Sequence, residues 1–381
     1  MRLTFFGSVL GYHQEGLAKA FYNILGDDYH YVVFSDLPDY RKEAGFENLA
    51  DKYSFVVKAY TPEGKEKTEE LINNSDVVII GAAPNDVIEK CVSKGIETYL
   101  FSERFFKMGT WRAFVPPIRK KVVKRAARFK QPNFKVLCAS AYLPYDLALC
   151  GWRGKAYKWG YFPEVVKYDI DELMSKKATK DKTVNILWVG RLIDWKHPEE
   201  SLWVAKHLKE KNLPFHMNII GYGELESFIK DEIKNNQLDD YITFLGKKTV
   251  PEVREAMENA DIFLMTSDYH EGWGVVINES MNCGCVVIAD AAAGASRYLI
   301  DDGKTGFIYK NNNIRSMFPV IEKLITDEIY RKEMQENAYY YMVDNASPEV
   351  VASRFISLCE DKTEFDDGFC SVAPIIKSAK K

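Results

Sequence analysis

The stretch that decides the fold is Glu271-Gly-Trp-Gly-Val-Val-Ile-Asn-Glu279, in which seven residues separate two glutamates. It follows the apolar, strand-like run 261–266, and its Gly-x-Gly turn leads into a predicted helix that ends near Cys283. A helix of this span rises about 12 Å, which is an upper bound because Glu271 precedes the helix. The glycines would let an anion reach the N–H groups at the helix N-terminus. A nucleotide-diphosphate sugar fits this pattern, and so does a loop with one solvated and one capping glutamate.

Two cations follow a second apolar strand. The run Ile186-Leu-Trp-Val-Gly190 is typical of a buried parallel strand, and Arg191 comes directly after it. Lys196 lies five residues further on, just before a predicted helix that opens with Pro198. Open α/β sheets bind ligands at the carboxyl ends of their strands. Two fixed cations there could neutralise a diphosphate without a metal, although taken alone they are equally typical of solvated surface charges.

Further motifs follow in a set order between Val184 and Lys310. They are Ile219-Ile-Gly221-Tyr-Gly-Glu224, Phe244-Leu245-Gly246, Val286-Val-Ile-Ala289 and Asp302-Gly-Lys-Thr-Gly306. Together with the two cations and the paired glutamates, this order resembles the C-terminal half of the glycosyltransferase family 4 enzymes (glycosyl transferases group 1). Those enzymes are retaining transferases of the GT-B fold. The motifs match over about a third of the chain. Elsewhere the resemblance is limited to the expected architecture.

The resemblance implies a role for each matched residue. Arg191 and Lys196 match the cations that bind the donor diphosphate, Glu271 the carboxylate that faces the donor sugar, and Glu279 the one that holds the ribose hydroxyls. The backbone at Leu245 and Gly246 would meet the base, for which uridine is expected. The rest of the expected donor-binding set is Gly190, Gly221, Gly272, Trp273, Gly274 and Val275. The resemblance implies no protein nucleophile, no cofactor and no metal.

One segment departs from the family pattern. The family usually carries two glycines and then a glutamate before the Asp-Gly-x-x-Gly turn. The matching stretch here is Gly294-Ala-Ser-Arg-Tyr298, with Ala295 in place of the second glycine and Tyr298 near the glutamate position. Ala295 carries a side chain where the family has none, so the close approach of the ligand to the backbone there is not expected. The supporting carboxylate of the family is absent as well.

The pattern and the resemblance imply an α/β protein of the GT-B fold, with two Rossmann-like, doubly wound domains facing a cleft. The strands predicted in the first half are Leu3–Phe6, Tyr31–Phe34, Phe55–Val57, Val77–Ile80, Glu97–Phe101, Val136–Ala139 and a segment over 157–162. We expect an acceptor-binding domain over 1–165, a nucleotide-sugar-binding domain over 183–345, and a returning helix and tail over 346–381 that pack on the first domain. The polar run 176–182 predicts a linker. Asp169-Ile-Asp171, although it spells a metal motif of another transferase fold, is interpreted as solvated charge.

The acceptor side is expected in the first domain. In the family the N-terminal loop lines the acceptor and phosphate side of the cleft, which makes Gly11, Tyr12 and His13 candidates. Glu103 ends a predicted strand and could face the same side. A lone histidine is more often a polar loop residue, and a solvated glutamate is the alternative for Glu103.

Composition places the chain among soluble globular proteins. It has 381 residues, 46% hydrophobic and 28% charged, enough for two domains. We find no signal peptide and no apolar stretch near the ~20 residues of a membrane-spanning helix. Seven scattered cysteines indicate reduced thiols. The expected location is therefore cytoplasmic, with peripheral attachment to the inner face of the membrane as an option.

That option rests on a basic segment over 104–130. Between Glu103 and Lys130 there are ten Lys or Arg against one acid, on a chain whose net charge is −4. Aromatic residues are interleaved, among them Phe105, Phe106, Trp111 and Phe114. This composition predicts a surface for anionic lipid, with Ile118 to Phe129 as an amphipathic, interfacial helix. A solvated helix face or the lining of an acceptor channel is the alternative; nucleic acid is disfavoured because no recognised module is present.

The sequence thus predicts a retaining glycosyltransferase that moves a sugar from a nucleotide-diphosphate donor, a UDP-sugar, to a hydroxyl acceptor. A saccharide, plausibly lipid-linked and part of cell-surface polysaccharide synthesis, is the expected acceptor. Two alternatives remain open. One is a nucleotide-sugar hydrolase or epimerase of the same fold, and the other is a non-catalytic nucleotide-sugar-binding subunit of a transferase complex.

Overall fold

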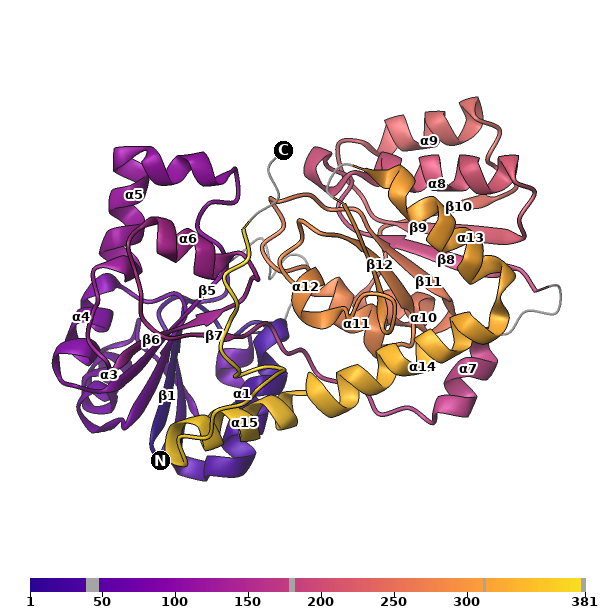
Figure 1. Ribbon diagram of the computed structural model, residues 1–381. Helices are drawn as coiled ribbons and strands as arrows, with labels where there is room; N and C mark the ends of the chain where they lie inside the picture. The colour runs from indigo at the N-terminus through magenta and orange to yellow at the C-terminus, as the bar shows by residue number, and fades with distance from the viewer. Residues whose placement is uncertain (39–47, 178–181, 311–312, 378–381) are drawn as a thin grey trace. The chain divides into compact units, whose positions relative to one another are not determined.

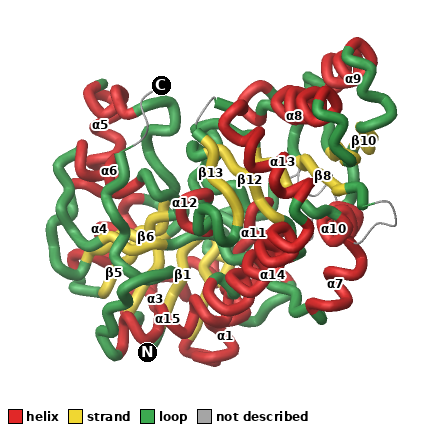
Figure 2. The backbone as a smooth tube through the Cα atoms, turned by 45° about the vertical axis from the view of Figure 1, so that its right-hand side comes forward, coloured by secondary structure: helices red, strands yellow, loops and turns green. Residues whose placement is uncertain are grey.

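The protein folds into two compact units, each built around one parallel β-sheet. The structure, a computed structural model, describes residues 1–38, 48–177, 182–310 and 313–377. The first unit comprises Met1–Glu164 together with Ala346–Lys377, and the second comprises Val165–Asn345. Within each unit, helices lie on both faces of the sheet (Figures 1 and 2). The prediction of two Rossmann-like domains is confirmed.

The sheet of the first unit has the strand order β3-β2-β1-β4-β5-β6-β7, and every neighbouring pair is parallel. Its strands are short apolar runs because helices cover both faces of the sheet. Their bounds are β1 (Leu3–Gly7), β2 (Tyr29–Val33), β3 (Val56–Lys58), β4 (Val77–Ile80), β5 (Glu97–Ser102), β6 (Phe134–Cys138) and β7 (Ala156–Lys158). All four residues of β4, in the middle of the sheet, are buried.

Most helices of the first unit begin at or next to a proline. Thr61, for example, accepts a hydrogen bond from the N–H of Gly64 and precedes the proline at the start of α3. The helices are α1 (Tyr12–Leu25), α3 (Pro62–Asn74), α4 (Asn85–Ser93), α5 (Pro116–Val122), α6 (Leu143–Leu149) and α15 (Pro348–Glu360). Shorter helical turns are η1 (Gly26–Asp28), η2 (Leu49–Asp51), η3 (Thr110–Phe114) and the π-helical η4 (Val123–Ala127).

The returning helix predicted near the C-terminus is present as α15. It lies against α1 in the first unit (Figure 1). Phe355 of α15 is fully buried, and its ring packs edge-on against Phe21, Tyr99 and Trp159 with centroid distances of 5.7, 5.0 and 5.4 Å. Gly16 permits the close approach, since a Cβ there would lie 3.0 Å from Pro348. The first unit is therefore completed by residues that follow the whole of the second unit in the chain.

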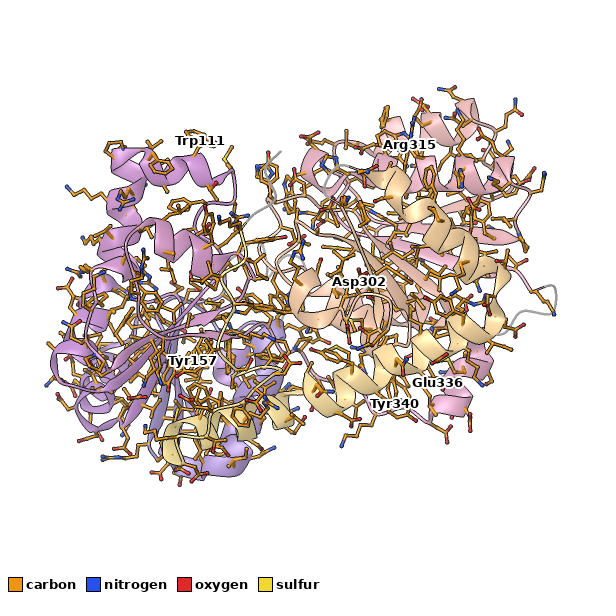
Figure 3. All side chains as sticks on the ribbon, in the orientation of Figure 1. Trp111, Tyr157, Asp302, Arg315, Glu336 and Tyr340 are labelled. Carbon is orange, nitrogen blue, oxygen red and sulfur yellow. The ribbon has the colours of Figure 1, made fainter. Side chains whose placement is uncertain are left out.

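The segment after α15 covers one edge of the first sheet. Residues 370–373 run antiparallel to β7, with Val372 opposite Tyr157, which Figure 3 labels within the first unit. The N–H of Lys158 donates to the carbonyl of Ser371 at 2.8 Å, and the N–H of Ala373 donates to the carbonyl of Ala156 at 2.9 Å. The sequence pattern gave no indication of this strand-like pairing.

The basic segment 104–130 is largely integrated into the first unit. Arg104 is buried and forms an ion pair with the equally buried Asp146 at 3.2 Å. The expected interfacial helix over 118–129 is wrong, because its apolar residues Val122, Ala126 and Phe129 pack into the core. Phe106 is buried as well. Among the described residues, no helix combines the length and the apolar character needed to span a membrane.

The sheet of the second unit has the strand order β10-β9-β8-β11-β12-β13 and is also entirely parallel. Its strands are β8 (Val184–Val189), β9 (Phe215–Ile220), β10 (Ile242–Gly246), β11 (Ile262–Met265), β12 (Val286–Asp290) and β13 (Gly306–Tyr309). The strand order reverses between β8 and β11, so the loops after these two strands diverge and leave room at the carboxyl edge of the sheet.

The second unit contains eight helices among the described residues. They are α7 (Ile170–Lys177), α8 (Pro198–Glu210), α9 (Glu226–Asn235), α10 (Val250–Asn259), α11 (Val276–Asn282), α12 (Ser296–Leu299), α13 (Phe318–Thr326) and α14 (Glu328–Asn345). The 3₁₀ turns η5 (Asp194–Lys196) and η6 (Ile314–Met317) precede α8 and α13. Most of the candidate site lies in the loops between these helices and the strands before them.

The polar run expected as a linker is structured at its start. Lys177, the last residue of α7, is buried and donates to the carbonyls of Met257 and Ala260 at 3.2 and 2.5 Å. Its amine therefore satisfies the carbonyls at the end of α10. Asp169 accepts a hydrogen bond from the N–H of Glu172 at 3.1 Å at the start of α7. The remainder of the expected linker, 178–181, lies outside the described residues.

Candidate functional site

The carboxyl edge of the second sheet gathers most of the residues singled out from the sequence. Gly190, Arg191 and Lys196 follow β8, and the loop 266–275 follows the neighbouring strand β11. Gly221 comes directly after β9, and Leu245 and Gly246 end β10. Because all these strands are parallel, the segments that follow them emerge at the same edge.

Lys196 and Glu271 form an ion pair at this edge. The ammonium of Lys196 contacts Oε2 of Glu271, and the two side chains are only 16% and 13% exposed. The pair joins the loop after β8 to the loop after β11. Partial burial limits screening by solvent, so the pair holds both side chains more firmly than an exposed one would.

The indole ring of Trp195 lies beneath both cations. The ammonium of Lys196 is 4.6 Å from the ring centroid, and the guanidinium of Arg191 is 6.0 Å from it. A cation over an aromatic face gains about 0.5–1 kcal/mol at an exposed site. Arg191 is exposed, so the ring restricts its guanidinium without removing it from solvent. Sequence reasoning assigned no role to Trp195, although it stands between the two cations in the chain.

Thr266 and Asp268 fix the backbone that carries Lys196. The hydroxyl of Thr266 accepts a hydrogen bond from Nε1 of Trp188 at 2.8 Å and donates one to the carbonyl of Lys196 at 2.6 Å. The N–H of Asp268 donates to the carbonyl of Trp195 at 3.0 Å. These bonds run from the buried strand ends to the loop, so the lysine is held by the sheet as well as by its ion pair.

His197, at the N-terminus of α8, lies between two carboxylates. His197 adopts a left-handed backbone conformation (φ 47°), and its Nδ1 lies 3.0 Å from Oε1 of Glu199. Its Nε2 lies 3.6 Å from Oδ2 of Asp268. Asp268 and Glu199 raise the pKa of His197 to about 10, against the opposing effect of burial. The imidazole is therefore protonated at neutral pH and ties α8 to the loop that carries Glu271.

Close packing or a positive φ explains three of the predicted glycines. A Cβ on Gly221 would lie 2.0 Å from the carbonyl oxygen of Gly190, so the loops after β8 and β9 touch through their backbones. Gly274 has φ +93°, and a Cβ there would lie 2.7 Å from the methyl carbon of Met265. Gly246 has φ +65° at the end of β10. Positive φ values favour glycine, as at Gly246 and Gly274.

Glu279 lies on α11 in a partly buried position. Burial raises the pKa of its carboxyl group to about 7, and the charge of Arg254 on α10 opposes that shift. The carboxyl group of Glu279 therefore keeps its proton to a higher pH than an exposed glutamate does. The helix itself has only seven residues, so the two cations, rather than the helix N-terminus, are the stronger indication of an anion site. Val275 precedes this helix and is partly exposed, and Gly272 is buried.

Trp273 is placed differently from the expectation of a ligand contact. Its side chain is 2% exposed, and its Nε1 donates to Oδ1 of Asn278 at 2.9 Å. Its carbonyl accepts a hydrogen bond from the N–H of Ala295 at 2.9 Å. The ring therefore supports the turn from inside the unit.

The segment that departs from the family pattern is folded without strain. Ala295 is buried and has a right-handed helical backbone (φ −79°, ψ −28°), which does not require glycine. Tyr298 is also buried, and its ring centroid is 6.4 Å from that of Trp273. An aromatic residue thus packs where the family pattern has a glutamate.

The acceptor-side candidates lie at the carboxyl edge of the first sheet. Gly11 precedes α1, and the exposed side chains of Tyr12 and His13 contact each other edge-on at 6.0 Å. Glu103 follows β5, where its carboxylate accepts hydrogen bonds from Lys107 at 2.6 Å and from the hydroxyl of Tyr161 at 3.2 Å. The structure does not test their role in acceptor binding, which stays a prediction.

Comparison with known proteins found a family model that matches the second unit. Residues 169–341 match the family model described as glycosyl transferases group 1. Over these residues the second unit is similar to glycosyl transferases of group 1. The expected resemblance to that family is confirmed for this part of the chain; membership of family 4 and a retaining mechanism stay predictions.

Curated relatives of this part of the chain come from archaea and bacteria. An uncharacterized glycosyltransferase of Methanocaldococcus jannaschii is 30% identical over 183 residues, 46% of this chain and 45% of that protein. The putative colanic acid biosynthesis glycosyltransferase WcaL of Escherichia coli is 28% identical over 47% of each chain. The amylovoran biosynthesis glycosyltransferase AmsK of Erwinia amylovora is 28% identical over 38% of this chain and 37% of its own. The matches therefore span less than half of each of these relatives.

Solved structures extend the likeness to both units. Anabaena HepE in complex with UDP has a TM-score of 0.66 at 16% identity and covers 95% of this chain and all of its own. The lipopolysaccharide outer core galactosyltransferase WaaB has a TM-score of 0.68 at 14% identity, again over 95% of this chain. At such low identity the likeness shows the fold alone. That fold is GT-B, as the sequence predicted.

Proposed function

We propose that the protein is a retaining glycosyltransferase that moves a sugar from a nucleotide-diphosphate donor to a hydroxyl acceptor. The observation that carries the proposal is the ion pair between Lys196 and Glu271, with Arg191 above the same Trp195 ring, at the switch point of the second sheet and within the residues that match the group 1 family model. This arrangement places two cations and a carboxylate where open α/β sheets bind ligands.

The cations would act on the leaving group. As the bond between the sugar and the diphosphate breaks, negative charge develops on the departing phosphate oxygens. Arg191 and Lys196, held in advance by Trp195, Thr266 and Glu271, would stabilise that charge without reorganising. The acceptor hydroxyl attacks on the face that the diphosphate leaves, and its proton passes to the departing phosphate. The protein then contributes positioning and charge and supplies no nucleophile.

Two carboxylates would hold the two ends of the donor. Glu271, next to Lys196, would accept hydrogen bonds from sugar hydroxyls, and Glu279 would accept them from the ribose diol. An ionised carboxylate accepts from two hydroxyl groups at once. Burial raises the pKa of Glu279 to about 7, so donor binding would draw its carboxyl group into the ionised form. The exposed backbone at Leu245 and Gly246 would meet the base.

The choice of a uridine donor and a saccharide acceptor draws on the relatives. HepE has been solved with UDP and with UDP-glucose, and the names of WcaL and AmsK place those proteins in colanic acid and amylovoran biosynthesis. We therefore propose a UDP-sugar donor and a lipid-linked saccharide acceptor in surface polysaccharide synthesis. Metal independence is part of the same proposal, since the two cations supply the charge that a divalent ion would otherwise supply.

A non-catalytic nucleotide-sugar-binding subunit is the second candidate. It is favoured by the segment around Ala295, whose N–H is already bonded to the carbonyl of Trp273, and by Tyr298 at the glutamate position. Such a subunit would bind the donor through the same residues without turning it over. A hydrolase of the same fold would release free sugar from the donor when no acceptor is present.

A thermal-shift screen of nucleotide-sugars tests the donor site first. A ligand at 100 times its dissociation constant stabilises the fold by about 2.7 kcal/mol. We expect one UDP-sugar to raise the melting temperature of the wild type, and Arg191→Ala and Glu279→Ala to abolish the rise. Arg315→Ala and Glu336→Ala, at the two labelled positions in η6 and α14 (Figure 3), should leave it unchanged. A screen without any response contradicts the proposed donor site.

A transfer assay with the donor identified then separates the candidates. Wild-type protein should transfer the sugar. Arg191→Ala and Lys196→Ala, which each remove one charge-stabilising group, should slow transfer about 10²–10³-fold. Binding without transfer or sugar release would favour the non-catalytic subunit. Release of free sugar without acceptor would favour the hydrolase. The anomeric configuration of the product, determined by NMR, decides between retention and inversion.

A further inference from the structure

The short turn η3 of the first unit and the residues just before it present three large apolar side chains to solvent. Met108, Trp111 and Phe114 are 53%, 63% and 74% exposed, and we call them the apolar tip. They fall within seven consecutive residues, whereas most other exposed apolar residues of the chain are scattered singly. Figure 3 shows Trp111 at the outer end of the first unit, beside α5 and away from the sheet.

The apolar tip is a built feature of the fold. Gly109 has φ +110°, and a Cβ on it would lie 2.8 Å from the ring of Trp111, so only glycine lets the ring lie where it does. Nε1 of Trp111 donates to the carbonyl of Met108 at 3.2 Å. Ala113, between the exposed residues, is fully buried, and Arg119 donates to its carbonyl at 3.3 Å. The surrounding structure thus fixes the backbone of this segment and the ring of Trp111.

Three exposed lysines adjoin the apolar tip. Lys120, Lys121 and Lys124 lie on α5 and η4, and their spacing places them on the face opposite the buried residues Val122 and Ala126. We call them the lysine face. Other cations of the segment are engaged: Arg104 with Asp146, Lys107 with Glu103, Arg128 with Glu89, and Arg125 with backbone carbonyls. In the described part of the chain, no carboxylate lies within ion-pair distance of the lysine face.

We infer that the apolar tip and the lysine face together bind the surface of an anionic membrane. Three neighbouring side chains of this kind can enter the boundary between headgroups and acyl chains, and basic residues beside them are attracted to anionic headgroups. Trp in particular is enriched at that boundary. A protein partner is disfavoured, because a stable protein interface buries about 800 Å² on each side, far more than three side chains offer. The inference does not depend on the proposed transferase activity.

The experiment measures sedimentation of the full chain with phosphatidylcholine vesicles and with vesicles that also contain phosphatidylglycerol. Wild-type protein should bind the anionic vesicles, and added salt should weaken the binding. Replacing the lysine face by glutamine should weaken it about a hundredfold, at roughly fivefold for each lysine. Trp111→Ser with Phe114→Ser should weaken it about tenfold or more. Vesicle binding that is equally tight without phosphatidylglycerol, or absent altogether, overturns the inference.

Matched control variants guard against non-specific effects. Trp203→Ser with Phe228→Ser removes two exposed aromatic residues of the second unit, and Lys206→Gln with Lys211→Gln and Lys234→Gln removes three exposed lysines there. Both sets should bind vesicles like the wild type; losses equal to those of the tip and lysine-face variants overturn the inference. Circular dichroism and thermal unfolding confirm that each variant is folded.

A spectroscopic readout places Trp111 directly. Vesicles with brominated lipid chains should quench part of the tryptophan fluorescence of the wild type. Trp111→Phe should retain most of the vesicle binding and lose that quenching, while Trp203→Phe should keep it. Quenching that persists in Trp111→Phe overturns the proposed mode of insertion. Self-association that depends on concentration, is lost with the apolar tip and occurs without vesicle binding would instead identify the tip as a contact between copies of the chain.

Discussion

The hydroxyl of Thr266 donates a hydrogen bond of 2.6 Å to the backbone carbonyl of Lys196, and so connects the end of one central strand to the loop that carries a candidate catalytic cation. The same oxygen accepts a hydrogen bond from Trp188 at 2.8 Å. Neither residue contributes a charge or a nucleophile. Trp188 lies on β8 and Thr266 follows the neighbouring strand β11, so the position of Lys196 depends on a hydrogen bond between these two strands.

Thr266→Val tests this dependence, because valine has nearly the shape of threonine but cannot form hydrogen bonds. The substitution leaves the N–H of Trp188 buried without its acceptor, and we expect a loss of about 1–3 kcal/mol in the free energy of unfolding. Sugar transfer should slow as well, since Lys196 loses its backbone support. Urea unfolding and steady-state kinetics measure the two effects. Thr266→Ser, which keeps the hydroxyl, should lie close to the wild type in both; an equally large loss in the serine variant would contradict the role of the hydroxyl.

Glu279 should make donor binding dependent on pH near neutrality. Burial raises the pKa of its carboxyl group from 4.5 to about 7, and only the ionised form accepts both ribose hydroxyls. The affinity for the donor should therefore rise as the pH increases through about 7 and level off above it. Isothermal titration calorimetry over this range measures the effect, and Glu279→Gln should bind weakly at every pH. A wild-type affinity that does not change across this range would contradict the assignment.

Without ligand, the same carboxyl group should make the free energy of unfolding decrease as the pH rises, whereas the affinity for the donor increases. A carboxyl group with a raised pKa in the folded state binds protons more tightly there than in the unfolded chain. The wild type should therefore lose stability relative to Glu279→Gln as the pH rises from 4.5 to about 7. Chemical denaturation of both proteins at several pH values measures the difference.

His197 should stabilise the fold while it is protonated. Asp268 and Glu199 raise its pKa from 6.5 to about 10, so its contribution is fully present below pH 6.5 and is lost as the pH rises through about 10. His197→Asn keeps a residue that tolerates the left-handed backbone and removes the titrating group. The difference in unfolding free energy between wild type and variant should shrink steadily over this pH range. NMR titration of the imidazole offers an independent check: a pKa near 6.5 would disprove the pairing.

Gly221→Ala should disturb the edge where the donor is proposed to bind. The added Cβ would lie 2.0 Å from the carbonyl oxygen of Gly190, and backbone cannot move away cheaply. Overpacking of this kind costs about 1–3 kcal/mol, and the displaced loop also carries Arg191. Gly11→Ala is the control, because a Cβ there meets nothing within 4 Å. Thermal unfolding with and without the donor distinguishes loss of stability from loss of binding.

The strands and their order follow closely from the sequence, because buried parallel strands are continuous apolar runs. Val77–Ile80 has the predicted bounds, and α11 ends where Cys283 and Gly284 indicate. The motif order also brings Arg191, Lys196 and Glu271 to one edge, since each follows a parallel strand. These features are local or depend only on strand order, which is why a single sequence reveals them.

Contacts between side chains that lie far apart in the chain could not be predicted from the sequence. Arg104 was counted among surface charges of a basic segment, yet Asp146, 42 residues later, pairs with it in the core. Trp273 was expected at the ligand and packs inward on Asn278. Composition and spacing do not show which face of a turn a side chain occupies. Thr266 and Trp195 were missed for the same reason, although both lie within the motifs themselves.

The return of α15 to the first unit has a consequence for synthesis of the protein. Chains emerge from the ribosome in sequence order, and N-terminal domains generally fold first. Here the partner of α1 and the strand-like segment 370–373 beside β7 follow the entire second unit. Until they emerge, the aromatic residues around Phe21 lack Phe355 and the edge of β7 is open to pairing with other chains. The unit that begins the chain is thus the last to be completed, and the second unit is free to fold before it.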